Sequence, residues 1–237
     1  MAEDLLNPAL LEQARKVLRP LYRYHHFQIH GLEHVPREGP ALLVVHHSLA
    51  TYDGFLLGDA IYAGTGRLPR GLGDDRIFQI PGLRELALAV GIVPASPEAG
   101  ERLLRAGYIV GVAPGGMWES LRPHTERRRS RWEGRRGFVR LALREGVPMI
   151  FAAVPAADEI YKVYPSRWTD VVYERLHWPV PVARGVGPTL VPRPVTLTAW
   201  LSPPLRPPVW EPEREEAQVD ALSAAAKAEM ASLLARG

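Results

Sequence analysis

The chain has 237 residues, of which 46% are hydrophobic and 23% are charged. This length is typical of one globular domain with a substantial buried core. The chain contains no cysteine, so disulfides, zinc–thiolate sites, iron–sulfur clusters and thiol nucleophiles are excluded. No apolar run reaches the ~18–20 residues that a membrane-spanning helix requires. The acidic start, at Glu3 and Asp4, is unlike a secretory signal peptide and predicts a cytoplasmic protein.

The formal net charge is only +3, but the basic residues are unevenly distributed. Residues 122–136, called here the arginine-rich segment, contain seven arginines and two glutamates. Such a segment indicates either a site for an anion, such as a lipid headgroup or a phosphorylated ligand, or a solvated basic loop. We expect no nucleic-acid partner, because only Trp118 and Trp132 lie close enough in sequence to stack on bases.

A helical pattern opens the chain. Asn7 and Pro8 are typical of a helix N-cap and first helical position, and apolar residues then recur at helical spacing between basic ones. We expect an amphipathic basic helix within residues 1–26. It either packs on the domain or lies in a membrane interface.

Apolar runs that suit strands then alternate with helical patterns. The expected strands are residues 27–30, 41–45, 91–95, 108–113, 148–154 and 195–201. The expected helices are residues 50–63, 82–90, 98–106, 137–144 and 219–234. This alternation predicts an α/β fold with a mixed, largely parallel central sheet flanked by helices. We expect a single domain, 1–237, in which residues 27–205 form the core and residues 211–237 contain the C-terminal helix.

Polar sequences follow two of these strands, and the carboxyl ends of parallel strands meet at one edge of a sheet. The strand 41–45 runs into His46 and His47, and Asp53 follows in the first turn of the next helix. A histidine can take a proton near neutral pH, and a nearby aspartate can fix its tautomer. A pair at this spacing is also typical of a capping or core hydrogen bond.

The strand 108–113 ends in Pro114, Gly115 and Gly116, with Glu119 beyond them. Two glycines let backbone N–H groups approach an oxyanion or a phosphate, although Pro-Gly-Gly also suits a simple turn. We expect His46 to be structural and Ser48 to be a turn or helix-cap hydroxyl, since no Gly-x-Ser-x-Gly sequence surrounds it. No metal site is expected, because the histidines lack metal-binding spacing.

Taken together, these segments resemble the glycerolipid acyltransferase superfamily, which includes glycerol-3-phosphate and lysophosphatidate acyltransferases. The resemblance extends from about residue 29 to residue 205. Its blocks are similar to residues 47–55, to 78–83 with 91–96, to 112–119 and to 146–150. Five residues separate His47 from Asp53, which resembles the branch that includes diacylglycerol and phytyl-ester-type acyltransferases rather than the commoner spacing.

The resemblance implies an O-acyltransferase in which His47 deprotonates a hydroxyl of the acceptor and Asp53 orients His47. The alkoxide then attacks the thioester of acyl-CoA or of an acyl-carrier protein, with no acyl-enzyme intermediate and no other cofactor. Residues that resemble the third block would bind the acceptor: Pro114, Gly115, Gly116 and Glu119. Because both substrates carry long chains, we expect peripheral association with the inner face of the membrane.

The acceptor is expected to be a lipid alcohol without a phosphate. Phosphate-accepting members end the second block in an arginine, where this chain has residues 94–97, and the third block lacks the usual threonine-arginine after its acidic residue. A phosphate-bearing acceptor remains the alternative, with the arginine-rich segment, Arg76 or Arg84 as substitutes. An inactive lipid-binding module and a hydrolase that uses water are the competing functions.

Overall fold

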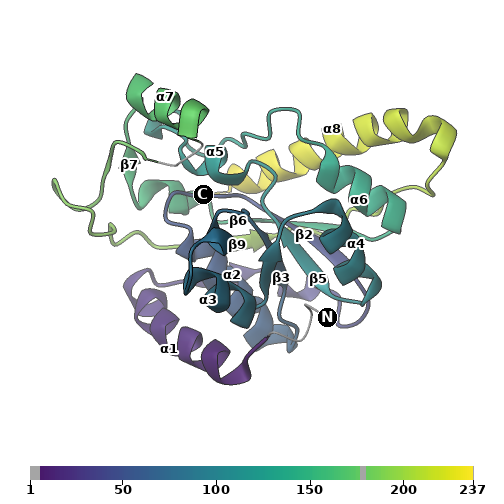
Figure 1. Cartoon of the computed structure of the whole chain (residues 1–237), viewed down its shortest axis with the longest axis horizontal. Helices are drawn as coiled ribbons and strands as arrows, with labels where there is room; N and C mark the ends of the chain where they lie inside the picture. The colour runs from purple at the N-terminus through teal and green to yellow at the C-terminus, as the bar shows by residue number, and fades with distance from the viewer. Residues whose placement is uncertain (1–5, 177–179, 237) are drawn as a thin grey trace.

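The computed structural model describes residues 6–176 and 180–236 (Figure 1). A seven-stranded sheet crosses the molecule in the order β1-β9-β6-β2-β5-β3-β4. Its strands are β1 Gln28–His30, β2 Ala41–Val45, β3 Arg70–Gly73, β4 Ile92–Pro94, β5 Ile109–Val112, β6 Met149–Ala153 and β9 Thr198–Leu201. All pairings are parallel except that of β6 with β9. The mixed, largely parallel sheet predicted from the sequence is confirmed.

Helices flank the sheet on both faces (Figure 1). They are α1 Pro8–Tyr24, α2 Tyr52–Thr65, α3 Leu83–Ala89, α4 Pro97–Arg105, α5 Gly116–Ser120, α6 Gly137–Glu145, α7 Arg167–Leu176 and α8 Glu215–Leu234. Successive residues of β2 point to opposite faces of the sheet. Leu42 and Val44 pack with α4, α6 and α8, whereas Leu43 packs on the face that α2 covers. This double burial explains why β2 is an uninterrupted apolar run.

The helix α1 begins as predicted and packs on the domain. The side chain of Asn7 accepts hydrogen bonds from the N–H groups of Ala9 and Leu10. Further along the helix, the Tyr22 hydroxyl donates to the carbonyl of Leu56 at 2.8 Å and so joins α1 to α2. No residue of α1 is fully buried, which leaves its outer basic surface exposed.

The sequence predicted neither β3 nor α5 nor α7, nor the small sheet of β7 Lys162–Val163 and β8 Ala183–Arg184. The strand β3 has the sequence Arg-Gly-Leu-Gly, which lacks the residues that favour strands. It forms because β4 and β5 pair with it on either side. Glycine is required at position 73, since a Cβ there would lie 2.8 Å from the side chain of Ile92.

The strands β2 and β5 are direct parallel neighbours, so their carboxyl ends lie at the same edge of the sheet. The predicted polar segments after these strands therefore meet. Among the described residues, no helix is both long enough and apolar enough to cross a membrane.

Candidate active site

A sharp turn separates β2 from α2. Thr51 has φ +58°, which is rare for a residue with a side chain, and the N–H of Tyr52 donates to the carbonyl of Ala50 at 2.6 Å. This is the geometry of a strained γ-turn. The turn reverses the chain within a few residues and starts α2 close to the end of β2, which brings Asp53 near His47.

The backbone of His47 is held from both sides. Its N–H donates to Oε2 of Glu119 at 3.1 Å, and its carbonyl accepts from Nη2 of Arg122 at 3.3 Å. The half-buried imidazole of His47 reaches the wall of a cavity. The ring therefore projects from a backbone whose position is fixed by two charged side chains.

A buried charge cluster of His46, Glu119, Arg122 and Asp158 lies beneath the loop. The side chains of Arg122 and Asp158 are only 2% and 7% exposed. They pair through Nη2 to Oδ1 at 2.7 Å and Nε to Oδ2 at 3.2 Å. Removal of either partner would leave an unpaired buried charge, which costs about 3–5 kcal/mol.

His46 belongs to this cluster, and it also lines the cavity described below. Nη2 of Arg122 lies 2.6 Å from its Nε2. Because a guanidinium can only donate, Nε2 is the acceptor of this contact, which leaves Nδ1 as the nitrogen that carries a proton. That nitrogen faces Oε1 of Glu119 at 3.7 Å. The structural role expected for His46 agrees with this geometry.

Asp53 is buried and accepts a hydrogen bond from the hydroxyl of Ser48 at 2.8 Å. Burial raises the pKa of Asp53 to about 6, although the Ser48 hydrogen bond opposes this shift. Ser48 thus positions the carboxylate, whereas the sequence predicted a turn or cap hydroxyl. Within the described chain, neither a hydrogen bond nor an ion pair joins the ring of His47 to Asp53, so the expected direct contact is not formed in this structure.

The protonation state of His47 follows from its surroundings. Burial lowers the pKa of His47 to about 4, and the negative charge of Glu119 opposes the shift only in part. The imidazole is therefore neutral at neutral pH and has a nitrogen free to accept a proton. Desolvation lowers the pKa of His47 but raises the pKa of Asp53, because it disfavours the charged form of each side chain.

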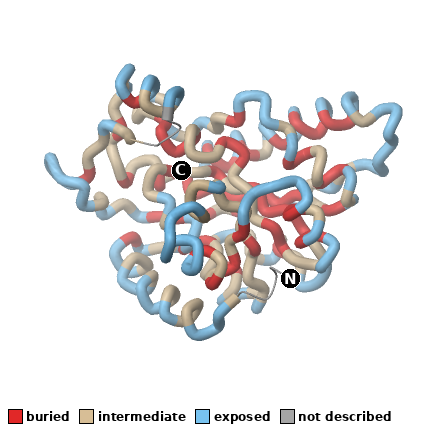
Figure 2. The backbone as a smooth tube through the Cα atoms, in the orientation of Figure 1, coloured by how far each residue is buried: buried red, intermediate tan, exposed pale blue. Residues whose placement is uncertain are grey.

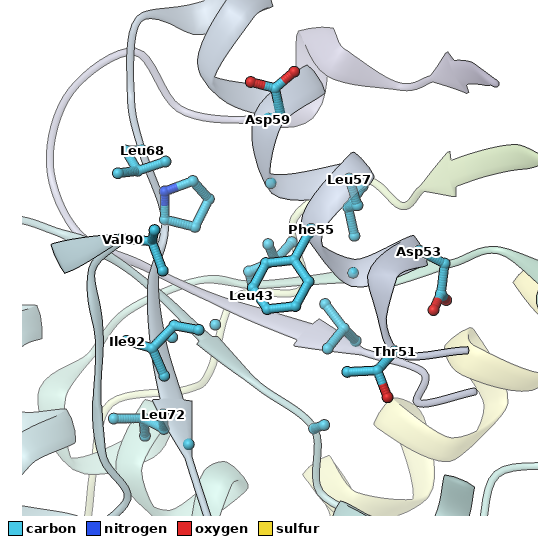
Figure 3. Close-up of a pocket in the computed structure, with 18 of the residues that line it drawn as sticks. Leu43, Thr51, Asp53, Phe55, Leu57, Asp59, Leu68, Leu72, Val90 and Ile92 are labelled. Atoms are coloured by element: carbon cyan, nitrogen blue, oxygen red, sulfur yellow. The ribbon is translucent and has the colours of Figure 1, made fainter. Parts of the chain in front are cut away.

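His47 and Asp53 share one cavity of about 280 Å³ between α1, α2 and the strands β2, β3 and β5. Its wall is largely apolar and includes Leu18, Leu43, Phe55, Leu72, Val90 and Ile92. Figure 3 shows Asp53 and Asp59 on α2 at two ends of this apolar surface. The guanidinium that lines the cavity, that of Arg15, is paired with Asp59 at 2.5 Å. The cavity therefore suits a hydrocarbon chain.

The predicted acceptor-binding segment lies beside the cavity wall rather than in it. Glu119 is fully buried, and its second oxygen accepts the N–H of Arg131 at 2.9 Å. A Cβ on Gly115 would lie 2.4 Å from the Cβ of Glu119, so glycine is needed for this packing. The N–H of Gly116 donates to the carbonyl of Ala113 at 3.0 Å. Pro114 is buried as well. Of these residues Glu119 holds the His47 backbone, and the role of the segment in binding the acceptor stays a prediction.

The arginine-rich segment is mostly engaged in internal contacts. Arg131 pairs with Glu126 at 2.6 Å, and Arg136 pairs with Asp220. Nη1 of Arg135 donates to the backbone carbonyl of Gly115 at 2.7 Å. The segment therefore stabilises the loop after β5 and the contact with α8, and it is not an open patch of free cations.

Sequence reasoning missed two residues of the site. Arg122 could not be separated from the other arginines around it, although it follows Glu119 by one helical turn. Asp158 lies in the short helix Pro155–Glu159, just after β6. The rule that polar residues after parallel strands share one edge could have found it. Among the described residues, no group of histidine, aspartate and glutamate side chains could hold a metal ion.

Comparison with known proteins identifies the family. The family model described as "Acyltransferase" matches residues 26–154, which include the β2 loop, the cavity strands and Glu119. The chain belongs to this acyltransferase family. This membership agrees with the resemblance noted in the sequence.

Two relatives carry the same name, "DGAT1/2-independent enzyme synthesizing storage lipids". The protein from Bos taurus is 28% identical over 91% of this chain and 65% of its own length. The protein from Homo sapiens is 31% identical over 60% of this chain and 45% of its own length. The chain thus spans less than two thirds of either relative.

The fold is also that of a solved structure. The 1-acyl-sn-glycerophosphate (LPA) acyltransferase PlsC from Thermotoga maritima superposes with a TM-score of 0.59 and 14% sequence identity. The match covers 96% of this chain and 80% of that protein. At this identity, the likeness concerns the fold alone.

The raised pKa of Asp53 has a consequence for stability. The folded state holds the proton up to about pH 6, compared with an ordinary value of 3.8, so the free energy of unfolding falls as pH rises between these values. The variant Asp53→Asn can still accept the hydrogen bond from Ser48. We expect it to raise the free energy of unfolding by about 1–3 kcal/mol at pH 7.5 and to have little effect at pH 4.

Urea denaturation at the two pH values measures this difference. The control is Asp59→Asn in the same helix, which removes the negative charge that pairs with Arg15. That variant should be no more stable than the wild type at either pH. An Asp53→Asn protein that is less stable at pH 7.5 would contradict the prediction.

Proposed function

We propose that this acyltransferase moves a fatty acyl group from the thioester of acyl-CoA or an acyl-carrier protein to the hydroxyl of a neutral lipid, with His47 as general base. The observation that carries this proposal is the shared cavity of His47 and Asp53. Its wall is apolar, and its guanidinium is already paired.

In the proposed reaction, neutral His47 takes the proton of the acceptor hydroxyl as the oxygen attacks the thioester carbonyl. The new C–O bond forms, the C–S bond breaks, and the leaving thiolate takes the proton from His47. General-base help of this kind contributes about 10²–10⁴-fold to the rate. Two features support this role: the neutral state of His47 at neutral pH and the fixed position of its backbone.

Asp53 stabilises the imidazolium that forms during the reaction, through its negative charge in a desolvated site. Its carboxylate is ionised above about pH 6, and Ser48 positions it. Ser48 is not a nucleophile in this proposal, because its side chain is buried and does not line the cavity. Direct transfer without an acyl-enzyme is therefore favoured over a serine hydrolase.

A neutral acceptor fits the charges around the site. A phosphate monoester needs charge-assisted contacts, each worth about 1.5–3 kcal/mol. Arg15 pairs with Asp59, Arg122 with Asp158, and the arginine-rich segment is largely occupied. The bovine and human relatives, by name, synthesize storage lipids, which agrees with this class of acceptor.

An acceptor panel tests the proposal. The purified full chain is incubated with palmitoyl-CoA or palmitoyl-carrier protein and, in separate reactions, with diacylglycerol, monoacylglycerol, a long-chain alcohol, glycerol 3-phosphate and lysophosphatidate. We expect ester formation with a non-phosphorylated acceptor at a kcat/KM at least about tenfold above that for either phosphate, equivalent to ~1.4 kcal/mol. Preference for glycerol 3-phosphate or lysophosphatidate would contradict a neutral acceptor.

Three matched variants separate the competing functions in the same assay. His47→Ala should lose about 10²–10⁴-fold in kcat, whereas Ser48→Ala should retain transfer to the alcohol. His46→Ala should lower stability as well as activity, because it removes a member of the buried charge cluster. Release of free fatty acid as the main product, abolished by Ser48→Ala, would instead identify a hydrolase, and binding without turnover would identify an inactive lipid-binding module.

If the acyl chain lies in the cavity, a larger side chain at position 58 should change the preference of the enzyme for donors of different chain length. Gly58 lies in α2 and lines the cavity, and a Cβ placed there meets no atom within 4 Å. We therefore expect Gly58→Leu to fold normally and to fill part of the cavity. Its kcat/KM ratio for palmitoyl over octanoyl donors should fall by about tenfold or more, because each excluded CH₂ forfeits ~0.8 kcal/mol of burial.

Gly137→Leu is the matched control, since Gly137 is also a helical glycine with open space beside it and lies outside the cavity. It should leave the chain-length ratio unchanged. An unchanged ratio in Gly58→Leu would show that the acyl chain lies elsewhere.

A further inference from the structure

Residues 77–90 form one segment of the cavity wall, and this segment has apolar side chains both toward the cavity and toward the outer surface. Its ends, Ile77 and Val90, line the cavity. Its middle, residues 79–86, is exposed throughout, and Figure 2 shows this stretch around α3 in pale blue in front of the buried sheet. The exposed fractions of its apolar side chains are 37% for Ile80, 45% for Leu83 and 48% for Leu86.

The helix α2, which lines the same cavity, adds a fourth apolar side chain. Phe55 is 44% exposed and also lines the cavity. We call Phe55, Ile80, Leu83 and Leu86 the outer apolar patch. Large side chains that gather on a surface in this way mark a site of contact with a partner or a membrane. The patch shares its wall with the cavity, so whatever covers it lies directly beside the cavity.

Basic residues accompany the patch. Arg84 lies within α3 between Leu83 and Leu86 and is exposed, and the carboxylate of Glu85 beside it accepts the N–H of Gly82. The basic outer surface of α1 adjoins α3, because the N–H of Asn7 donates to the carbonyl of Ala89 at 3.0 Å. Lys16 is exposed there. Apolar side chains flanked by cations suit an interface with anionic lipid headgroups.

We propose that the outer apolar patch inserts into the surface of an anionic bilayer and brings the cavity against the lipid from which its substrates come. This inference rests on the proposed function for its choice of partner, since a lipid substrate reaches the cavity most directly from a bilayer. With hydrocarbon in the cavity and acyl chains outside, the segment 77–90 has apolar surroundings on both sides.

A second protein is a poorer occupant. A stable interface between proteins buries about 800 Å² on each partner, whereas the patch consists of four side chains centred on a seven-residue helix. A few inserted side chains with nearby cations are sufficient for reversible binding to a bilayer surface.

The cysteine-free sequence allows a direct test. Leu83→Cys in the full chain is labelled with the environment-sensitive fluorophore NBD and mixed with vesicles of phosphatidylcholine, with or without phosphatidylglycerol. The control is Leu190→Cys, which is 71% exposed and lies outside the cavity wall. We expect a blue shift and an intensity increase at position 83 with phosphatidylglycerol vesicles, and no change at position 190. No change at position 83, or an equal change at both positions, would overturn the proposal.

A second pair of variants measures affinity by vesicle flotation. Leu83→Glu/Leu86→Glu should lower the partition coefficient by about tenfold or more, and Arg84→Gln should lower it only on anionic vesicles. Wild-type binding by the double variant would contradict the proposal. So would sedimentation data in which the wild type is a dimer and the double variant a monomer, because a second copy would then cover the patch.

Acyl transfer is measured in a separate assay, so that the proposed function and the membrane proposal can be refuted independently. Without vesicles and with an octanoyl thioester donor, the double variant should retain the wild-type rate, since neither leucine contacts the cavity. A wild type that inserts Leu83 into vesicles but transfers no acyl group would refute the proposed function and leave this surface intact. A wild type that transfers acyl groups but shows no fluorescence change at position 83 would refute the membrane proposal and leave the proposed function standing.

Discussion

The buried ion pair of Arg122 with Asp158 is the interaction on which the site depends. Removing two charges from water costs several kcal/mol for each ion, and the pair offsets this only through good geometry and additional hydrogen bonds. Arg122 has these bonds: it donates to the carboxylate of Asp158, to His46 and to the backbone carbonyl of His47. The pair therefore joins the segments that follow β5 and β6, and the contacts of Arg122 with His46 and His47 fix the loop after β2.

The charges and the apolar surface of the site occupy separate places. Glu119, Arg122 and Asp158 of the buried charge cluster do not line the hydrocarbon-lined cavity, whereas His46 and His47 do. Because the backbone of His47 is bound by Glu119 and Arg122, its ring can be desolvated without losing its position. The same desolvation leaves His47 neutral and makes Asp53 a weaker acid. The protein thus gives up some stability at Asp53 to keep a free base and a carboxylate in one apolar cavity.

The sequence predicted those parts of the fold that depend on local pattern. The apolar run of β2, the Asn7 cap of α1 and the shared edge of β2 and β5 are all confirmed. The strand β3 was missed because only its pairing with β4 and β5 makes it a strand. In the site, the approach of Ser48 to Asp53 requires the turn at Thr51, which no sequence pattern indicated. Asp158 lies 112 residues from His46, so only the folded sheet brings them together.

The protonation state of the His47 ring tests the account most directly. A heteronuclear NMR titration of the full chain, with the signal assigned by its loss in His47→Gln, reports that state as a function of pH. The account predicts a ring that stays neutral from pH 8 down to about 4, as its burial requires. A midpoint near the ordinary histidine value of about 6.5 would contradict it, because His47 would then be a solvated side chain rather than a base presented to an apolar cavity.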